Sequence, residues 1–189
     1  MNPLASEGNH HRQPWYQCAC CPPNIARFLA SLERYVYWVE DRKIFVNLFI
    51  GGEAQTALAG NKIKLKQQTE YPWKEQTKIN VSVQEFSQFT IAIRIPQWCE
   101  DDVTLQINKT PIKLESKMEG GYAELTRRWE DGGLIEMEVP MNIKHIRAHP
   151  KVKANVGRGC LKRGLIVYCL EDVDNVAPQI TLFFLKKSH

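Results

Sequence analysis

The sequence predicts a mainly β protein in which one N-terminal helix precedes an antiparallel β-sandwich and a truncated second β element. Apolar residues recur at helical spacing only over residues 23–34, after which the period changes to two. From there on, short alternating runs are separated by turn residues, at a spacing typical of a sandwich. Hydrophobic residues make up 43% of the 189 residues, which is enough for a packed core.

The helix is predicted over residues 23–34, after about 20 polar residues that predict an extended loop. Pro22 and Pro23 suit a first helical turn, where the missing N–H costs nothing. The apolar stripe consists of Ile25, Phe28, Leu29 and Leu32. Because one short helix cannot bury such a stripe alone, it either packs on the sandwich or has its partners outside this chain.

Strands are predicted where apolar and polar residues alternate, most clearly over residues 77–83 and 90–95. We expect strands over residues 35–39, 43–50, 62–67, 78–83, 89–95, 103–107, 121–125 and 134–139. After residue 140 a basic strand over 143–149, a loop at 156–159 and an apolar strand over 164–170 indicate an incomplete second β-domain. The predicted domains are therefore residues 1–34, 35–141 and 142–189.

Charge and cysteine usage narrow the class of partner. The net charge is only +4 and the Lys and Arg residues are scattered, so we expect no nucleic acid partner. No apolar run approaches the roughly 20 residues of a membrane span, so we expect no membrane partner. The start of the chain lacks the basic and apolar regions of a secretory signal. Six cysteines without an export signal predict reduced thiols and a cytoplasmic location.

Three cysteines, Cys18, Cys20 and Cys21, lie within four positions just before the predicted helix. A helix N-terminus favours the thiolate, the form that binds metal and attacks electrophiles. Two neighbouring thiolates can share one zinc ion, which takes four Cys, His or carboxylate ligands. Cys18, His10, His11 or a residue outside this chain would complete the set. The spacing is not that of a zinc finger, and a buried thiol cluster or redox chemistry are the alternatives.

Other residues carry weaker signals. The segment 10–16 predicts either a surface loop or a sugar-binding wall, in which His10 and His11 contact hydroxyls and Trp15 contacts a ring face. The remaining cysteines lie in or beside apolar strand patterns and are predicted to be small core residues; they are Cys99, Cys160 and Cys169. No paired carboxylates, Ser–His–Asp arrangement or phosphate-binding glycine loop indicates another chemistry.

Several motifs resemble glycoside hydrolase family 127, the β-L-arabinofuranosidases. They are Asn-Pro-Leu at 2–4, His-His-Arg-Gln-Pro-Trp at 10–15 and Cys-Ala-Cys-Cys-Pro-Pro-Asn at 18–24. Residues 94–98 and 164–171 are similar to the downstream β-domains of that family, so the resemblance covers essentially the whole chain. It implies a retaining exo-glycosidase built on an (α/α)6 barrel followed by β-sandwich domains.

The resemblance also implies roles for single residues. Cys20 would be a zinc-bound thiolate nucleophile, Cys21 a second zinc ligand, zinc the cofactor and an L-arabinofuranoside-containing carbohydrate the partner. In the family, the acid/base glutamate and the other two zinc ligands precede the Cys-Cys pair. The chain would then be a C-terminal fragment, with residues 1–34 as a remnant of the barrel. Alone it would be inactive, and a complementing barrel chain or a homodimer would be its protein partner.

Two other classes of function are compatible with the same residues. One is a non-catalytic carbohydrate-binding or scaffolding β-sandwich whose cysteines have lost their role. The other is a small, independent metal- or redox-binding protein. The three hypotheses differ in what they predict for Cys20, because only the glycosidase requires that thiol for turnover.

Overall fold

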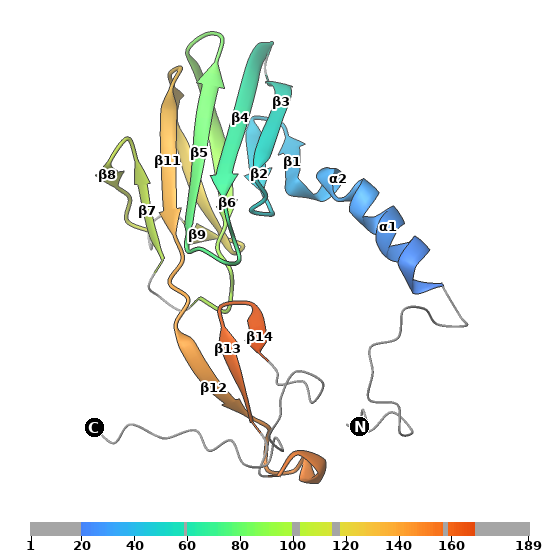
Figure 1. Cartoon of the computed structure of the whole chain (residues 1–189). Helices are drawn as coiled ribbons and strands as arrows, with labels where there is room; N and C mark the ends of the chain where they lie inside the picture. Colours follow the sequence, from blue (N-terminus) through green and yellow to red (C-terminus); the bar gives the residue numbers. More distant parts are fainter. Residues whose placement is uncertain (1–19, 59, 100–102, 115–117, 157–158, 169–189) are drawn as a thin grey trace. The chain divides into compact units, whose positions relative to one another are not determined.

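The computed structural model describes residues 20–58, 60–99, 103–114, 118–156 and 159–168 (Figure 1). The chain divides into two compact units, and the division near the C-terminus falls between Asn142 and Ile143. The larger unit holds two packed β-sheets, and the smaller unit holds a three-stranded sheet. The predicted fold class, a helical start followed by a sandwich and a further β element, is confirmed. In the described part of the chain, no helix has the length and apolar character needed to cross a bilayer.

The helices are α1, Cys21–Ser31, and α2, Glu33–Val36. The five-stranded sheet has the order β1-β2-β6-β10-β9, with bounds Tyr37–Glu40, Lys43–Val46, Ser87–Arg94, Tyr122–Trp129 and Met118–Glu119. The six-stranded sheet has the order β3-β4-β5-β11-β7-β8, with bounds Gly52–Leu58, Asn61–Thr69, Gln76–Val83, Gly133–Glu138, Thr104–Ile107 and Thr110–Pro111. The smaller unit contains β12, β13 and β14, with bounds Ile143–Arg147, Gly159–Arg163 and Ile166–Tyr168, and a 3-10 turn at Lys153–Asn155.

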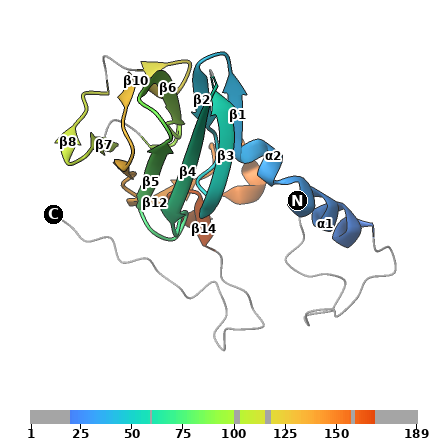
Figure 2. The ribbon, with the colours of Figure 1, turned by 90° about the horizontal axis from the view of Figure 1, so that it is seen from above.

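The two larger sheets pack face to face (Figures 1 and 2), and one hydrophobic core lies between them. Ile44 and Val46 of β2 and Ile79 and Val81 of β5 are at most 1% exposed. Each such side chain contributes roughly 1.5–3 kcal/mol on burial. The pairings are antiparallel, as predicted, except that β2 and β6 run parallel. Buried and more exposed residues alternate along β2 and β5 because one face of each strand packs on the core and the other faces solvent.

Two polar side chains inside the core, Trp129 and Gln67, donate hydrogen bonds to neighbouring segments of the chain. The indole Nε1 of Trp129 donates to the carbonyl of Phe89 at 3.1 Å, which joins β10 to β6. The amide Nε2 of the buried Gln67 donates to the hydroxyl of Tyr37 at 2.8 Å and to the carbonyl of Leu48 at 3.2 Å. Since a buried donor without a partner is costly, these contacts fix the chain segments that supply the acceptors.

The structure corrects several predicted boundaries. Helical structure continues through α2 to Val36, so the strand predicted from residue 35 begins at Tyr37. The strand predicted over 43–50 ends at Val46. The sequence predicts no strand at β3, and it predicts a loop that includes Gly159, the first residue of β13. β3 and β13 both contain glycine and alternate little between apolar and polar residues, so the period-two signal of a strand is weak in them.

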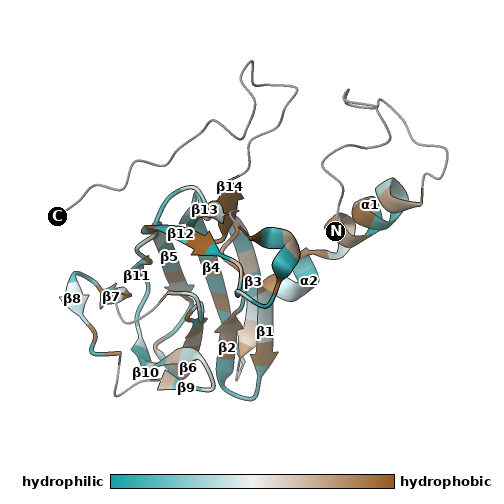
Figure 3. Ribbon diagram, turned by 90° about the horizontal axis from the view of Figure 1, so that it is seen from below, coloured by the Kyte–Doolittle hydropathy of each residue, from teal (hydrophilic) through white to brown (hydrophobic). Residues whose placement is uncertain are grey.

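The α1 helix buries none of its residues among the described part of the chain. Ile25, Phe28 and Leu29 are each more than half exposed. Figure 3 shows hydrophobic residues along this helix. The first alternative from the sequence, that the helix packs its stripe on the sandwich, is therefore wrong for the described residues.

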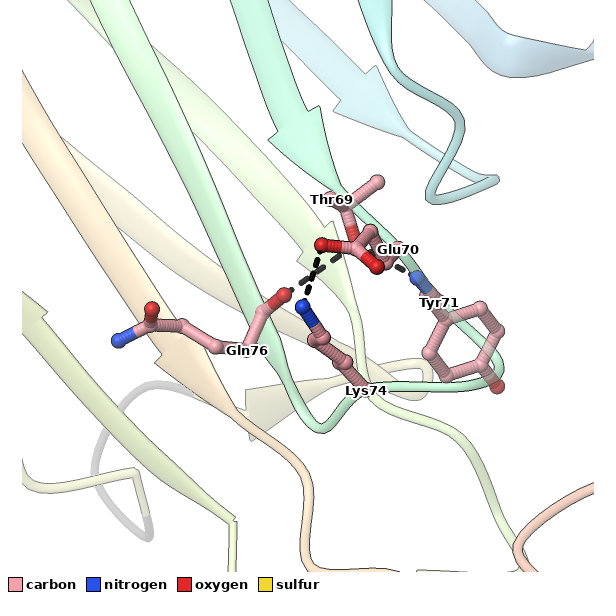
Figure 4. Close-up of polar contacts among 5 residues, drawn as sticks. All are labelled: Thr69, Glu70, Tyr71, Lys74 and Gln76. Atoms are coloured by element: carbon pink, nitrogen blue, oxygen red, sulfur yellow. Dashed lines mark hydrogen bonds and ion pairs between the residues drawn. The ribbon is translucent and has the colours of Figure 1, made fainter.

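The connection between β4 and β5 is held by local hydrogen bonds (Figure 4). The Thr69 hydroxyl accepts from the backbone N–H of Tyr71 at 3.1 Å and donates to the carbonyl of Gln76 at 3.3 Å. Lys74 and Glu70 form an exposed ion pair at 2.6 Å. Trp73 lies in this connection, between Tyr71 and Lys74, and is 66% exposed.

Tyr37 provides a test of the buried hydrogen bond to Gln67. Burial raises the pKa of Tyr37, and the Gln67 hydrogen bond opposes this shift. When a tyrosine has a higher pKa in the folded than in the unfolded state, its protonated form stabilises the fold. That stability is fully present below the unfolded-state pKa of about 10 and is lost as the pH rises through the folded-state pKa. The Tyr37→Phe variant should therefore lose about 1 kcal/mol near neutral pH but decline less steeply above about pH 10.

Urea unfolding of both proteins at neutral and alkaline pH measures this difference. Burial also raises the pKa of Tyr71, so the variant should keep part of the alkaline decline. Equal alkaline slopes in the two proteins would contradict the role given to Tyr37.

Candidate functional site

Cys20 and Cys21 lie at the N-terminus of α1, as the sequence predicts. The helix begins at Cys21, two residues earlier than expected, and Pro22 and Pro23 occupy its first turn. Both prolines fit there because the first N–H groups of a helix have no intrahelical acceptor. Cys20 and Cys21 are reduced cysteines and both are exposed. A reagent or ligand can therefore reach both sulfur atoms in the described structure.

The two sulfur atoms are 3.9 Å apart. Two thiolates on one tetrahedral zinc ion, each at about 2.3 Å, are separated by about 3.8 Å. The observed spacing thus fits two ligand positions of a shared zinc ion. The same residues do not form a disulfide, in agreement with the strain expected for adjacent cysteines.

The described residues supply only this pair. Within them, no group of three or more His, Cys, Asp or Glu side chains is placed to hold a metal ion. The other residues that the sequence singles out for the site lie outside the described residues; they are His10, His11, Trp15 and Cys18. Their predicted roles therefore stay predictions.

The turn of α1 that follows the cysteines is closed by side chains. The Asn24 carboxamide oxygen accepts from the Arg27 guanidinium at 2.8 Å, one turn further along the helix. At the other end, the Ser31 hydroxyl donates to the carbonyl of Phe28 at 2.9 Å. The Asn24–Arg27 contact was not anticipated from the sequence, although the spacing of three residues is the signal for such a pair. It supports the helix end that carries the two sulfur atoms.

The other described cysteines belong to different surroundings. Cys99 packs against the edge of the sandwich core, and its sulfur donates to the carbonyl of Pro140 at 3.8 Å. Cys160 in β13 is half-buried. Both were predicted to be core residues, but the structure leaves each of them partly exposed, while Cys169 lies outside the described residues. Cys99 therefore serves as a natural control for the exposed pair.

Two family descriptions match the chain. Residues 43–141 match the middle domain of the GH127 β-L-arabinofuranosidases, and residues 143–188 match the C-terminal domain of glycoside hydrolase family 127. A non-reducing end β-L-arabinofuranosidase of Bifidobacterium longum subsp. longum is 34% identical over 170 residues, which are 87% of this chain and 25% of that protein.

Solved structures give the same result. A crystal structure of a GH127 β-L-arabinofuranosidase from Geobacillus stearothermophilus T6 has a TM-score of 0.80 at 41% identity, over 88% of this chain and 26% of that one. A second structure, described as a GH127 β-arabinofuranosidase, has a TM-score of 0.79 at 34% identity, over 93% of this chain and 30% of the other. The chain thus spans between a quarter and a third of the length of these relatives.

The exposure of the cysteine pair predicts the order of thiol modification. With iodoacetamide on the folded chain, Cys20 and Cys21 should be labelled to completion before Cys99 is half labelled, because these two are the exposed cysteines among the described residues. Site-resolved peptide mass spectrometry measures this order. In urea the difference should disappear, and equal rates in the folded chain would contradict the placement of Cys99.

Proposed function

The chain belongs to glycoside hydrolase family 127, and from this premise we propose that it carries part of the active site of a retaining β-L-arabinofuranosidase. The observation that supports the proposal is the exposed pair of sulfur atoms, 3.9 Å apart at the start of α1. The substrate class comes from the relatives, which are named for β-L-arabinofuranosidase activity.

In this proposal, Cys20 and Cys21 hold a zinc ion together with two ligands from outside the described residues. A bound zinc ion keeps a coordinating thiol deprotonated at neutral pH. The chain's own contribution is to present both sulfur atoms at a spacing that suits one ion, on a helix end that favours negative charge.

Cys20 is proposed to act as the nucleophile. Its thiolate attacks the anomeric carbon of a terminal β-L-arabinofuranoside, so that a C–S bond forms while the bond to the leaving oxygen breaks. The leaving oxygen takes a proton from a carboxylic acid. Water then attacks the same carbon, the resulting carboxylate accepts its proton, and the thiolate leaves. Two displacements at one carbon retain its configuration.

By the family resemblance, the acid/base glutamate and the other two zinc ligands would lie in a barrel. We therefore propose that a complementing barrel chain supplies these groups and that this chain has no turnover alone. The exposed side chains of Ile25, Phe28 and Leu29 give such a barrel an apolar surface to cover. We also propose a reducing, cytoplasmic location, since both thiols must stay reduced to act.

Zinc binding tests the role of the cysteine pair. Under native mass spectrometry with excess zinc, the 189-residue chain should bind one ion weakly, and a chelator should remove it readily, because two ligands fill half of the coordination sphere. Cys20→Ser and Cys21→Ser should each lose this ion, whereas Cys99→Ser, a substitution at the margin of the core, should keep it.

A Cys20→Ser variant that binds zinc like the unchanged chain would rule out the proposed ligand. A tight ion that resists the chelator and needs Cys20 would mean that the chain completes the site itself, and the partner proposal would then fail.

Hydrolysis of 4-nitrophenyl β-L-arabinofuranoside tests the role of the nucleophile. The chain alone should give no turnover with or without added zinc. Turnover by the chain alone that is lost in Cys20→Ser and kept in Cys99→Ser would support the nucleophile and refute the need for a barrel. Turnover that survives Cys20→Ser would refute the nucleophile.

A further inference from the structure

The outer face of the five-stranded sheet carries aromatic side chains on neighbouring strands. In β1 and β2 the inward positions are Tyr37, Ile44 and Val46, so Trp38 and Phe45 point outward, directly opposite each other in the β1–β2 register. The Trp38 side chain is 60% exposed. An exposed indole beside a second ring on a sheet face offers a flat apolar surface to a ligand.

Tyr122 of β10 extends this surface across the sheet. Its ring packs edge to face on Phe45, with the ring centroids 5.3 Å apart and the planes at 82°. The two residues belong to strands on either side of β6, and such strands are separated by roughly 10 Å. The residue of β6 opposite Phe45 is Ala92, whose small side chain leaves room for the rings to meet over it. Trp38, Phe45 and Tyr122 thus form one aromatic strip.

Polar groups along the strip are already held in position. The Lys43 ammonium forms an ion pair with the Glu124 carboxylate and lies 5.5 Å from the centroid of the Phe45 ring. The Tyr122 hydroxyl donates to the Asn47 side-chain oxygen at 2.8 Å. Each of these groups keeps further lone pairs or protons for hydrogen bonds to a ligand. The ion pair is partly exposed, so an incoming ligand must replace the water around it.

The outer face of the six-stranded sheet has a different character. Its outward positions include the ion pairs of Glu53 with Lys64 and Lys66 and of Lys78 with Glu136. Asn80 and Gln68 make a further polar contact there. None of these positions is aromatic, so the strip is a feature of one sheet face rather than of the sandwich in general.

We propose that the aromatic strip of Trp38, Phe45 and Tyr122 is a carbohydrate-binding surface for a neutral L-arabinofuranose-containing oligosaccharide. A sugar presents an apolar ring face and a rim of hydroxyls, which match a flat indole beside fixed polar groups. The hydroxyls can replace the water around the Lys43–Glu124 pair. An apolar protein partner would desolvate that pair without compensation, which is costly. The choice of sugar rests on the proposed function, whereas the surface is separate from the Cys20 thiol.

NMR titration of the indole N–H groups with methyl β-L-arabinofuranoside tests the surface, with Trp38→Ala used to assign the resonance of Trp38. We expect the Trp38 resonance to shift with a Kd of about 1–10 mM, as is usual for one small ligand on an open surface. Trp73→Ala is the matched control, because Trp73 is 66% exposed in the β4–β5 connection of the same sandwich. That variant should leave the Trp38 shift unchanged.

The same titration of Cys20→Ser separates this proposal from the catalytic one. An unchanged Trp38 shift in that variant supports the strip whatever the fate of the thiol chemistry. Loss of the shift in Cys20→Ser, equal shifts of Trp38 and Trp73, or no shift would overturn the strip as a sugar site. A Trp38 resonance that moves with protein concentration and not with sugar would also overturn it, because the face would then bind a second copy of the chain.

Discussion

The closed core between the two large sheets is the constraint on which the rest of the larger unit depends. Because successive strand residues point to opposite faces, filling the interior with Ile44, Val46, Ile79 and Val81 decides which side chains must face outward. A slip of one residue would send each of these groups into water. The outward sets follow from this alternation: an aromatic strip beside the Lys43–Glu124 pair on one sheet, and further ion pairs on the other. Gln67 also occupies an inward position. Its side-chain NH2 group can be buried there because the Tyr37 hydroxyl and the Leu48 carbonyl accept hydrogen bonds from it.

The same constraint explains how much of the fold the sequence could predict. The run 77–83 alternates between core and solvent, and it lies within β5, Gln76–Val83. β3 escaped prediction because it is the edge of its sheet and only Leu58 is fully buried, so its Gly and Ala residues carry no alternating signal. The early end of the predicted helix has a similar cause, as Tyr35 and Val36 are residue types typical of strands. The preceding helical residues extend the helix into this segment, where the Tyr35 N–H donates a hydrogen bond to the Leu32 carbonyl at 3.0 Å.

For the candidate site, the sequence predicts what is local and no more. Cys20 and Cys21 are adjacent and precede two prolines, and this pattern predicts two thiols at the start of a helix. The structure confirms that α1 begins at Cys21. The sulfur–sulfur distance of 3.9 Å depends on side-chain rotamers and needed the structure. The aromatic strip was missed for another reason. Phe45 and Tyr122 are 77 positions apart, and only the β2-β6-β10 order and the small Ala92 bring their rings together.

The apolar side of α1 and the two-sulfur pair lie on the same short helix, so in the proposed enzyme they depend on each other. An isolated helix of this length is marginal in water, and two thiolates fill only half of the coordination sphere of zinc. A barrel that covers Ile25, Phe28 and Leu29 would order the helix and so hold both sulfur atoms still for the remaining ligands. By linkage, completing the zinc site must stabilise the docked helix by the same free energy. In the proposed enzyme, the helix and the zinc site therefore stabilise each other, and the zinc-bound form of the nucleophile is completed only on assembly with the barrel.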